Sequence, residues 1–333
     1  MNLLITGGAG YIGSVLVEDL IKKGYFCVVI DSLETGHKRA VDPKAIFFHG
    51  DYGDISLLKK IFLEFKIDAV IHLAAYTLVS ESTVDPGRYL KNNLAKGIML
   101  LDEMVKAGIK KIVFSSSASV YGEPKRIPID EEDPLVPTSP YGLSKKLFEE
   151  ILEWYKKIYG LKYVSFRYFN ASGASAKYGE DHHPETHLIP NIIERAYKIK
   201  KGIRDIEPFH IYGNDYNTHD GTCIRDYIHV KDISKAHILA LKNLSKLKYK
   251  IFNLGNGSGY SVMEVFKTTE RITGVNIPFV IDKRRPGDPA ILVASANRVK
   301  KELGWKTDIP DLSDIINSAW KWKLNHPNGY NVL

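Results

Sequence analysis

Short apolar segments alternate with amphipathic segments through the first half of the chain. The apolar segments have the length of buried strands and lie at residues 3–6, 27–31, 46–49, 69–73, 111–115 and 163–167. The amphipathic segments have the spacing of helices with one apolar face and lie at residues 13–23, 54–65, 86–107 and 140–158. Right-handed crossovers place a helix after each buried strand, so this alternation predicts a parallel sheet covered on both faces. The predicted fold class is α/β, with a doubly wound, Rossmann-type sheet.

The pattern changes after Asn170. Residues 171–186 are rich in glycine, histidine, proline and small side chains, which is typical of a loop. Further helices are predicted at residues 188–200, 232–245, 261–273 and 311–325. A chain of 333 residues is long enough for about two domains. We therefore expect a sheet domain at residues 1–170, with a return segment near residues 228–250, and a smaller α/β domain at residues 171–333.

Composition excludes several classes of protein. The chain is 44% hydrophobic and 26% charged, and it has no apolar run of the length that a membrane helix needs. Strand-like sequence begins at once, so no signal peptide is expected. Cys27 and Cys223 lie in different kinds of segment, which argues against a disulfide framework and favours the cytoplasm. The net charge of +7 comes from scattered basic pairs at predicted helix ends, so neither a nucleic acid nor a membrane is an expected partner.

A glycine-rich loop, GGAGYIG at residues 7–13, follows the first predicted strand and opens the first helix. Glycines without β-carbons let the backbone approach a pyrophosphate, and the amides at the helix start stabilise its charge. No Gly-Lys-Ser/Thr follows, which excludes a P-loop nucleotidase. The pattern predicts a dinucleotide site.

Asp31 closes the second predicted strand and selects among dinucleotides. A carboxylate there accepts hydrogen bonds from the ribose hydroxyls and repels a 2′-phosphate, which favours NAD over NADP. Lys38 and Arg39 leave a 2′-phosphate clamp as the alternative. Residues at the ends of the third and fourth strands would border the same cofactor, namely Asp51, Tyr52, Leu73, Ala74 and Ala75.

Tyr141 and Lys145 lie one helical turn apart, just after an N-cap serine and a first-turn proline. The same spacing occurs at three other places in the chain, so it is the position of this pair that points to chemistry. Ser115, Ser116 and Ser117 end the fifth strand, at the sheet edge where ligands of such folds bind. A lysine cation at about 4 Å offers roughly 4 kcal/mol at an effective dielectric near 20. That is about three pKa units, enough to bring a phenol near 7 and make Tyr141 a general base for a hydroxyl that loses hydride.

Several motifs resemble the extended short-chain dehydrogenases/reductases: the glycine loop, SSSASVYG at 115–122, SPYGLSK at 139–145 and RYFN at 167–170. Later motifs resemble the UDP-glucose 4-epimerase family in particular: GNDY at 213–216, DGT at 220–222, RDYIHV at 225–230, NLG at 253–255 and RRPGD at 284–288. The resemblance runs from residue 1 to about residue 330. It implies that tightly bound NAD takes hydride from carbon 4 of a UDP-hexose and returns it to the opposite face, interconverting UDP-galactose and UDP-glucose.

The resemblance also implies roles for individual residues. Tyr141 would be the acid/base, Lys145 would lower its pKa and hold the nicotinamide ribose, and Ser117 would bind the oxygen at carbon 4. The implied cofactor residues are Gly7, Gly10, Tyr11, Ile12, Gly13, Asp31, Asp51, Tyr52, Leu73, Ala74, Ala75, Asn92, Ser115, Tyr141, Lys145 and Tyr168. Many such epimerases have lysine where this chain has Thr77, which puts one cofactor contact in doubt.

For the substrate, the resemblance implies that Arg225 and Arg285 grip the diphosphate and that Asp288 binds the uridine ribose. The full implied substrate set is Ser117, Tyr141, Asn170, His187, Leu188, Tyr212, Arg225, Arg285 and Asp288. Leu292 falls where the family gates N-acetyl groups, and its intermediate size leaves N-acetylhexosamines open as substrates. Uronic acid sugars also stay open. A homodimer built from the helices near 86–107 and 140–158 is implied as well.

Three other interpretations require different residues or a different role for the same fold. A nucleotide-sugar 4,6-dehydratase needs an acidic pair after Ser117, where this chain has Ala118 and Ser119. A non-catalytic NAD-binding regulator or RNA-binding relative would share the fold without the chemistry. A metal site at His182, His183 and His187 is not expected, because Pro184 breaks any helix that would align them.

Overall fold

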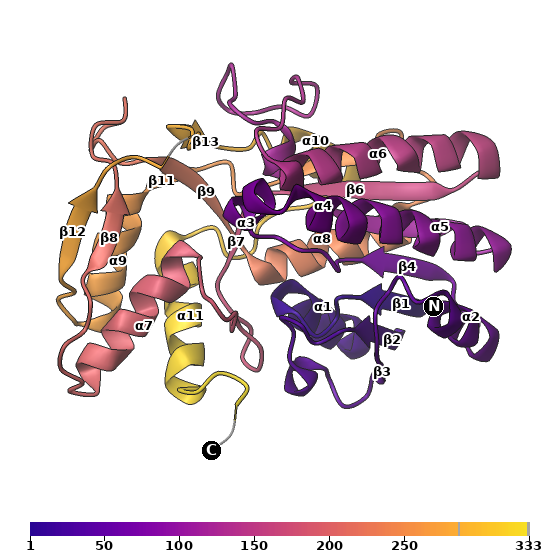
Figure 1. The fold of residues 1–333 in the computed structure, drawn as a ribbon, viewed down its shortest axis with the longest axis horizontal. Helices are drawn as coiled ribbons and strands as arrows, with labels where there is room; N and C mark the ends of the chain where they lie inside the picture. The colour runs from indigo at the N-terminus through magenta and orange to yellow at the C-terminus, as the bar shows by residue number, and fades with distance from the viewer. Residues whose placement is uncertain (286, 332–333) are drawn as a thin grey trace.

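The centre of the computed structural model is a parallel sheet of seven strands, in the order β10-β6-β5-β4-β1-β2-β3 (Figure 1). The structure describes residues 1–285 and 287–331; Pro286, within the 284–288 motif, lies outside the described residues. The strands are β1 (Asn2–Thr6), β2 (Phe26–Asp31), β3 (Ile46–His49), β4 (Ala69–His72), β5 (Lys111–Ser117), β6 (Lys162–Tyr168) and β10 (Ile251–Leu254). Neighbouring strands all run parallel. The predicted doubly wound α/β fold is confirmed.

Helices bury both faces of this sheet. On one face, Leu3 and Ile5 of β1 share a core with residues of α1 (Tyr11–Lys22) and α8 (Val230–Asn243). On the other, Leu4 shares a core with residues of α2 (Ile55–Glu64), α5 (Lys96–Lys106) and α6 (Pro140–Tyr159). Successive residues of a strand point to opposite faces, so a strand covered on both sides is apolar throughout. Each fully buried aliphatic side chain contributes about 1.5–3 kcal/mol.

The helix predicted at residues 86–107 is interrupted. It consists of α4 (Pro86–Leu90), a π-helical turn η2 (Lys91–Ala95) and α5, preceded by the short helix α3 (Val79–Val84). Single π-turns often occur where a helix presents a side chain to a functional site. Asn92 of η2 lines the large cavity described below.

The second half of the chain builds a smaller α/β region with its own core. Its helices are α7 (Leu188–Lys200), α9 (Val262–Thr273) and α11 (Leu312–Asn325). α10 (Asn297–Leu303) instead packs with α8 in the core of the large sheet. β9 (Ile224–His229) pairs with β7 (Asn170–Ser172), β11 (Gly259–Ser261) and β13 (Ile291–Leu292), while β8 (Phe209–Tyr212) pairs with β12 (Phe279–Asp282). Ile192, Phe266 and Ile316 are central to the core of this region. The chain also returns to the first sheet, because α8 packs against α1 and β10 pairs with β6 (Figure 1).

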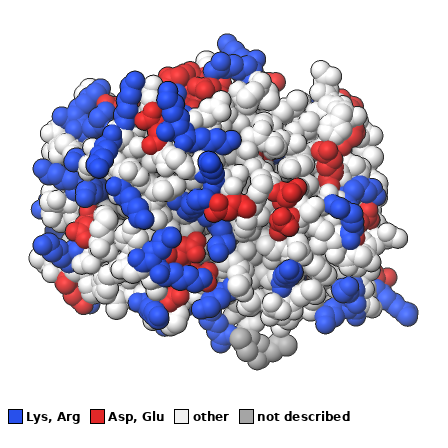
Figure 2. All heavy atoms as spheres, turned by 180° about the vertical axis from the view of Figure 1, so that it is seen from behind, with Lys and Arg blue, Asp and Glu red and all other residues white. Residues whose placement is uncertain are grey.

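The surface carries its positive charge in a dispersed form. On the face shown in Figure 2, Lys and Arg side chains are densest in the left half of the view, but acidic side chains lie among them. Across the described residues, no helix combines the length and the apolar character needed to cross a membrane. The two short 3-10 segments, η1 (Lys38–Ala40) and η3 (Ala118–Val120), complete the fold.

Three buried imidazoles predict a loss of stability in acid. Burial lowers the pKa of His72 to about 3 and those of His229 and His237 to about 4. Between pH 6.5 and 4 the unfolded chain therefore binds protons at these three sites that the folded chain does not, so their contribution to the free energy of unfolding falls as pH drops through this window. Asp226, whose pKa burial raises to about 6, offsets part of this loss. His237 alone accounts for about 3 kcal/mol of this loss.

Urea unfolding at several pH values between 7.5 and 4.5 checks this expectation. His237→Gln keeps one donor and one acceptor, and we expect its stability to fall less steeply with acid than that of the wild type. Equal slopes for wild type and His237→Gln would contradict the assignment.

Candidate active site

A cavity of about 1260 Å³ lies at the carboxyl ends of the strands, between the large sheet and the second half of the chain. It is lined by residues that follow β1, β2, β4, β5 and β6, which include the point between β1 and β4 where the strand order reverses. Ligands of doubly wound sheets bind at such a point. Every residue that the resemblance implies for the cofactor, the substrate or the proton transfer lines this cavity, as do Thr77 and Leu292.

The glycine loop forms a cradle that side chains would fill. Gly7 has a φ of +73°, and a β-carbon there would lie 2.6 Å from the backbone nitrogen of Ala74. A β-carbon on Gly13 would overlap the carbonyl oxygen of Gly7. Helix α1 begins after Gly10, with no side chain capping its first turn and no acidic residue within it. The first-turn amides are thus available to an anion, and the loop fits the pyrophosphate of a dinucleotide.

Asp31 stands at the end of β2 with both carboxylate oxygens fixed. Oδ2 accepts a hydrogen bond from the Ala9 amide and Oδ1 from the Leu33 amide, each at 2.9 Å. Burial raises the pKa of Asp31, and these two amides oppose that rise. Lone pairs remain on both oxygens for ribose hydroxyls.

The suggested 2′-phosphate clamp lies elsewhere. The Lys38 ammonium is 6.0 Å from the centre of the Phe47 ring, and Arg39 donates to the carbonyl oxygen of Tyr330 at 3.4 Å. Neither side chain belongs to the cavity wall in the described part of the chain. The geometry therefore favours a dinucleotide without a 2′-phosphate.

The start of α6 positions Tyr141 and Lys145. The Ser139 hydroxyl accepts a hydrogen bond from the Gly142 amide at 3.1 Å, and Pro140 occupies the first turn. Tyr141 and Lys145 are then 8% and 3% exposed, on the helix face that meets β5. The Lys145 ammonium donates to the carbonyl oxygen of Ser115 at 2.8 Å, and the Ser117 hydroxyl donates to the Ser119 hydroxyl at 3.1 Å.

The expected electrostatics of this pair are wrong in one respect. Burial raises the pKa of Tyr141 above its usual value, and only the polar Ser117 side chain opposes the rise. Burial also lowers the pKa of Lys145 to about 7, although the Glu149 charge works against this. Desolvation disfavours the charged form of both groups, so the lysine alone does not make the phenol acidic.

The opposite end of the cavity carries cations. Arg225 donates to the Ile224 carbonyl oxygen at 2.8 Å and forms an ion pair with Asp288. The Arg285 guanidinium stacks on Tyr212, 4.0 Å from the ring centre. Two guanidinium groups at one end suit a diphosphate, because each can donate two parallel hydrogen bonds.

Comparison with known proteins gives a consistent result. A model of the NAD dependent epimerase/dehydratase family matches residues 3–255. The chain belongs to this family. A protein of Lacticaseibacillus casei named UDP-glucose 4-epimerase is 48% identical over 333 residues, which cover 99% of both chains.

Solved structures of UDP-glucose 4-epimerases resemble this family member over almost its whole length. The enzyme of Brucella ovis in complex with NAD has a TM-score of 0.91 and 42% identity, covering 96% of this chain and 97% of the other. That of Bifidobacterium longum in complex with NAD+ and UDP has a TM-score of 0.91 and 38% identity, covering 99% and 100%.

Some residues of the cavity wall were missed at the level of sequence. Tyr76, after β4, donates its hydroxyl proton to Glu34, after β2, at 2.7 Å. Both residues line the cavity, so this hydrogen bond connects the segment after β2 with the segment after β4 at the cavity wall. The hydroxyl oxygen of Ser116 is buried at the wall without a hydrogen-bond partner among the described residues. No motif or spacing marks these contacts, because they depend on how separate loops meet.

Removing the hydrogen bond between Tyr76 and Glu34 is expected to increase the dissociation rate of NAD. Glu34 is half exposed, so Tyr76→Phe removes about 0.5–1.5 kcal/mol, or about two- to tenfold in the dissociation rate. The decay of bound NAD during dilution into a scavenging enzyme measures this rate. Tyr159→Phe, on an exposed tyrosine of α6, is the control and should keep the wild-type rate. A Tyr76→Phe rate equal to that of the control would contradict the role of this bond.

Proposed function

We propose that this protein interconverts UDP-galactose and UDP-glucose by transient oxidation at carbon 4, with NAD as its cofactor. The observation that carries the proposal is the joint placement of Ser117, Tyr141 and Lys145 in the cavity whose other wall is the glycine cradle. The name shared by close full-length relatives supports the same activity.

The protein's own groups handle the proton in this proposal. Tyr141 removes the proton from the hydroxyl at carbon 4 and later returns it, while Ser117 orients the oxygen that carries it. Bound NAD supplies the hydride acceptor and donor for carbon 4 and, when oxidised, a positive charge that favours the ionised phenol. Lys145, held by the Ser115 carbonyl oxygen, keeps a donor available to the cofactor ribose. The same hydroxyl-bearing carbon is oxidised and then reduced, so no second substrate is consumed.

The nucleotide anchors the substrate in this scheme. Arg225 and Arg285 bind the diphosphate, and Asp288 binds the uridine ribose. Binding energy from this remote part holds the molecule while the hexose presents either face to the nicotinamide. Asn170, His187, Leu188 and Tyr212 line the same cavity and complete the proposed nucleotide side.

The test uses the purified full-length protein with UDP-galactose alone. We expect UDP-glucose to appear without an added redox partner and to reach an equilibrium ratio that is the same from either side. A protein that binds NAD but turns over neither sugar, while binding RNA in a salt-sensitive way, would instead be the non-catalytic relative. Release of water, seen as a 4-keto-6-deoxy sugar, would indicate the dehydratase.

The exact hexose is the second part of the proposal. Ala118 and Ser119 follow Ser117, so no carboxylate stands there to remove water, which favours the epimerase over the dehydratase. The half-buried Leu292 lines the cavity and leaves N-acetylated sugars open. Turnover of UDP-N-acetylglucosamine and UDP-galacturonate beside UDP-galactose ranks the three substrates directly.

We further propose a homodimer in a reducing, cytoplasmic setting. Trp154 and Ile158 lie one turn apart on α6 and are 61% and 65% exposed, which is unusual for large apolar side chains outside an interface. Both cysteines are free and buried, in keeping with a reducing compartment. Light scattering is expected to give about twice the chain mass of 37.6 kDa, and a monomer at micromolar concentration would contradict the dimer.

A further inference from the structure

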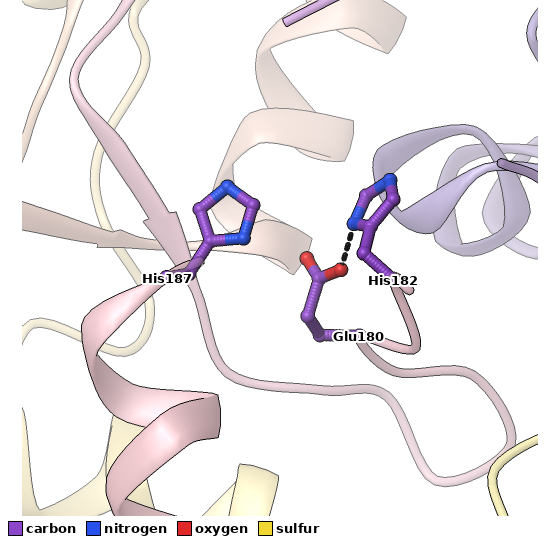
Figure 3. A group of neighbouring side chains, drawn as sticks. All are labelled: Glu180, His182 and His187. Atoms are coloured by element: carbon purple, nitrogen blue, oxygen red, sulfur yellow. Dashed lines mark hydrogen bonds and ion pairs between the residues drawn. The ribbon is translucent and has the colours of Figure 1, made fainter. Parts of the chain in front are cut away.

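Glu180, His182 and His187 come together at one wall of the cavity, although no helix aligns them (Figure 3). Glu180 and His182 lie on the loop before α7, and His187 is the N-cap residue of α7. One donor atom from each residue lies within 4.8 Å of the other two. We propose that these three side chains bind one transition-metal dication of the zinc type.

The donor set suits such an ion. Two imidazoles and one carboxylate are ligands that zinc accepts readily, and three protein ligands leave a coordination position open. A zinc ion with bonds of about 2.0–2.1 Å holds its donors about 3.3–3.5 Å apart. Nδ1 of His182 and the Glu180 carboxylate already share a hydrogen bond. The metal ion would take the place of the proton in that bond.

The charge of the loop favours a cation here. Glu180, Asp181 and Glu185 form ion-pair contacts only with imidazoles in the described part of the chain, and with no lysine or arginine. The cluster therefore attracts positive charge, which a dication supplies without protonating the imidazoles.

The surroundings hold the three donors in place. The Asp181 carboxylate accepts a hydrogen bond from the Tyr330 amide at 2.8 Å, and the Tyr330 hydroxyl donates to the Gly179 carbonyl oxygen at 3.1 Å. Glu185 contacts Nδ1 of His187 at 2.7 Å. A carboxylate that orients a ligating imidazole is a common outer partner of metal sites. The loop thus has the support that a preformed site needs.

The three side chains line the same cavity as Arg225 and Asp288, so an open coordination position there would be within the cavity. An oxygen of the nucleotide diphosphate could occupy it in place of water, a point that rests on the proposed function. The sequence alone did not predict a metal site at these histidines, because no helix or known zinc spacing aligns them. Here the loop turns at Pro184, so that His182 and His187 approach Glu180 from opposite sides (Figure 3).

Cobalt(II) is the probe that tests the site. Untagged, NAD-loaded protein is treated with a chelator, dialysed and titrated with Co²⁺, whose visible absorption is strong only in a tetrahedral or five-coordinate site. We expect one Co²⁺ per chain in the wild type, displaced by Zn²⁺. His182→Gln is expected to bind at least about 100-fold more weakly, whereas His183→Gln, on the exposed neighbour, keeps the wild-type affinity.

The thermal midpoint and NAD content of each variant show that it is folded, and Glu180→Gln provides a second variant in which the hydrogen bond is kept but the charge is lost. If the wild type gave no Co²⁺ spectrum at a stoichiometry of one per chain, the proposal would be overturned. Equal weakening by His183→Gln and His182→Gln would overturn it as well, since the binding would then be nonspecific.

A separate arm adds UDP to the Co²⁺-loaded wild type. A changed visible spectrum supports an open position within reach of the diphosphate. An unchanged spectrum, with UDP binding verified by calorimetry, overturns that part alone. Failure of UDP to bind at all counts against the proposed function and leaves the cobalt titration as the measure of the metal site.

Discussion

Tyr141→Phe is expected to lower kcat for UDP-galactose by about 10²- to 10⁴-fold. The variant lacks the phenol group that exchanges a proton with the hydroxyl at carbon 4. The ring stays, so the cavity keeps its shape and the NAD content should match that of the wild type. Steady-state turnover, together with NAD released on denaturation, measures both quantities.

The chain offers a matched control for this variant. Tyr197 also stands four residues before a lysine, on α7, but it does not line the cavity. Tyr197→Phe should therefore keep kcat within about twofold. If Tyr141→Phe kept wild-type turnover, or if both variants lost it equally, the proton-transfer role of Tyr141 would be wrong.

Gly13→Ala is expected to yield protein that is nearly free of NAD. The new methyl group would overlap the Gly7 carbonyl oxygen and lie 2.7 Å from the α-carbon of Gly8, both parts of the backbone. Backbone atoms cannot turn aside as a side chain does, so the loop itself must shift, at a cost of about 1–3 kcal/mol or more. The displaced backbone amides then no longer point at the pyrophosphate.

The absorbance ratio of the purified protein at 260 and 280 nm and the NAD released by acid give the cofactor content. Gly87→Ala is the control, because a β-carbon there meets only the Asp85 carboxylate, at 3.8 Å. Full NAD content in Gly13→Ala would show that the cradle tolerates a side chain and that its close packing is not what binds the pyrophosphate.

Much of the large sheet was predictable because its strands are buried on both faces. A strand such as β1 must be apolar throughout, and such a run followed by a helical pattern is hard to mistake. β10 was not predicted as a strand. It has only four residues, and the chain builds part of the second region before β10 pairs with β6, so no neighbouring pattern marks it. The break at η2 was missed as well, because a π-helical turn keeps nearly the same amphipathic pattern as the α-helix around it.

The residues that form the candidate site could be predicted from the sequence, but their pKa values could not. Strand ends of a parallel sheet meet at one edge, so residues after β1, β2, β4 and β5 were bound to share a cavity. The pKa values were not predictable, since they depend on how completely Tyr141 and Lys145 lose contact with water. The bond between Glu34 and Tyr76 and the cluster around Glu180 depend on loop paths that no periodicity encodes.

The pairing of β10 with β6 has a consequence for synthesis of the chain. The ribosome delivers residues 162–168 long before residues 251–254, so a nascent chain carries β6 as an unprotected edge, able to pair with other molecules. α8, which covers one face of the sheet, is also made late. Truncation at residue 170 should accordingly give an aggregating fragment rather than a small independent NAD-binding protein.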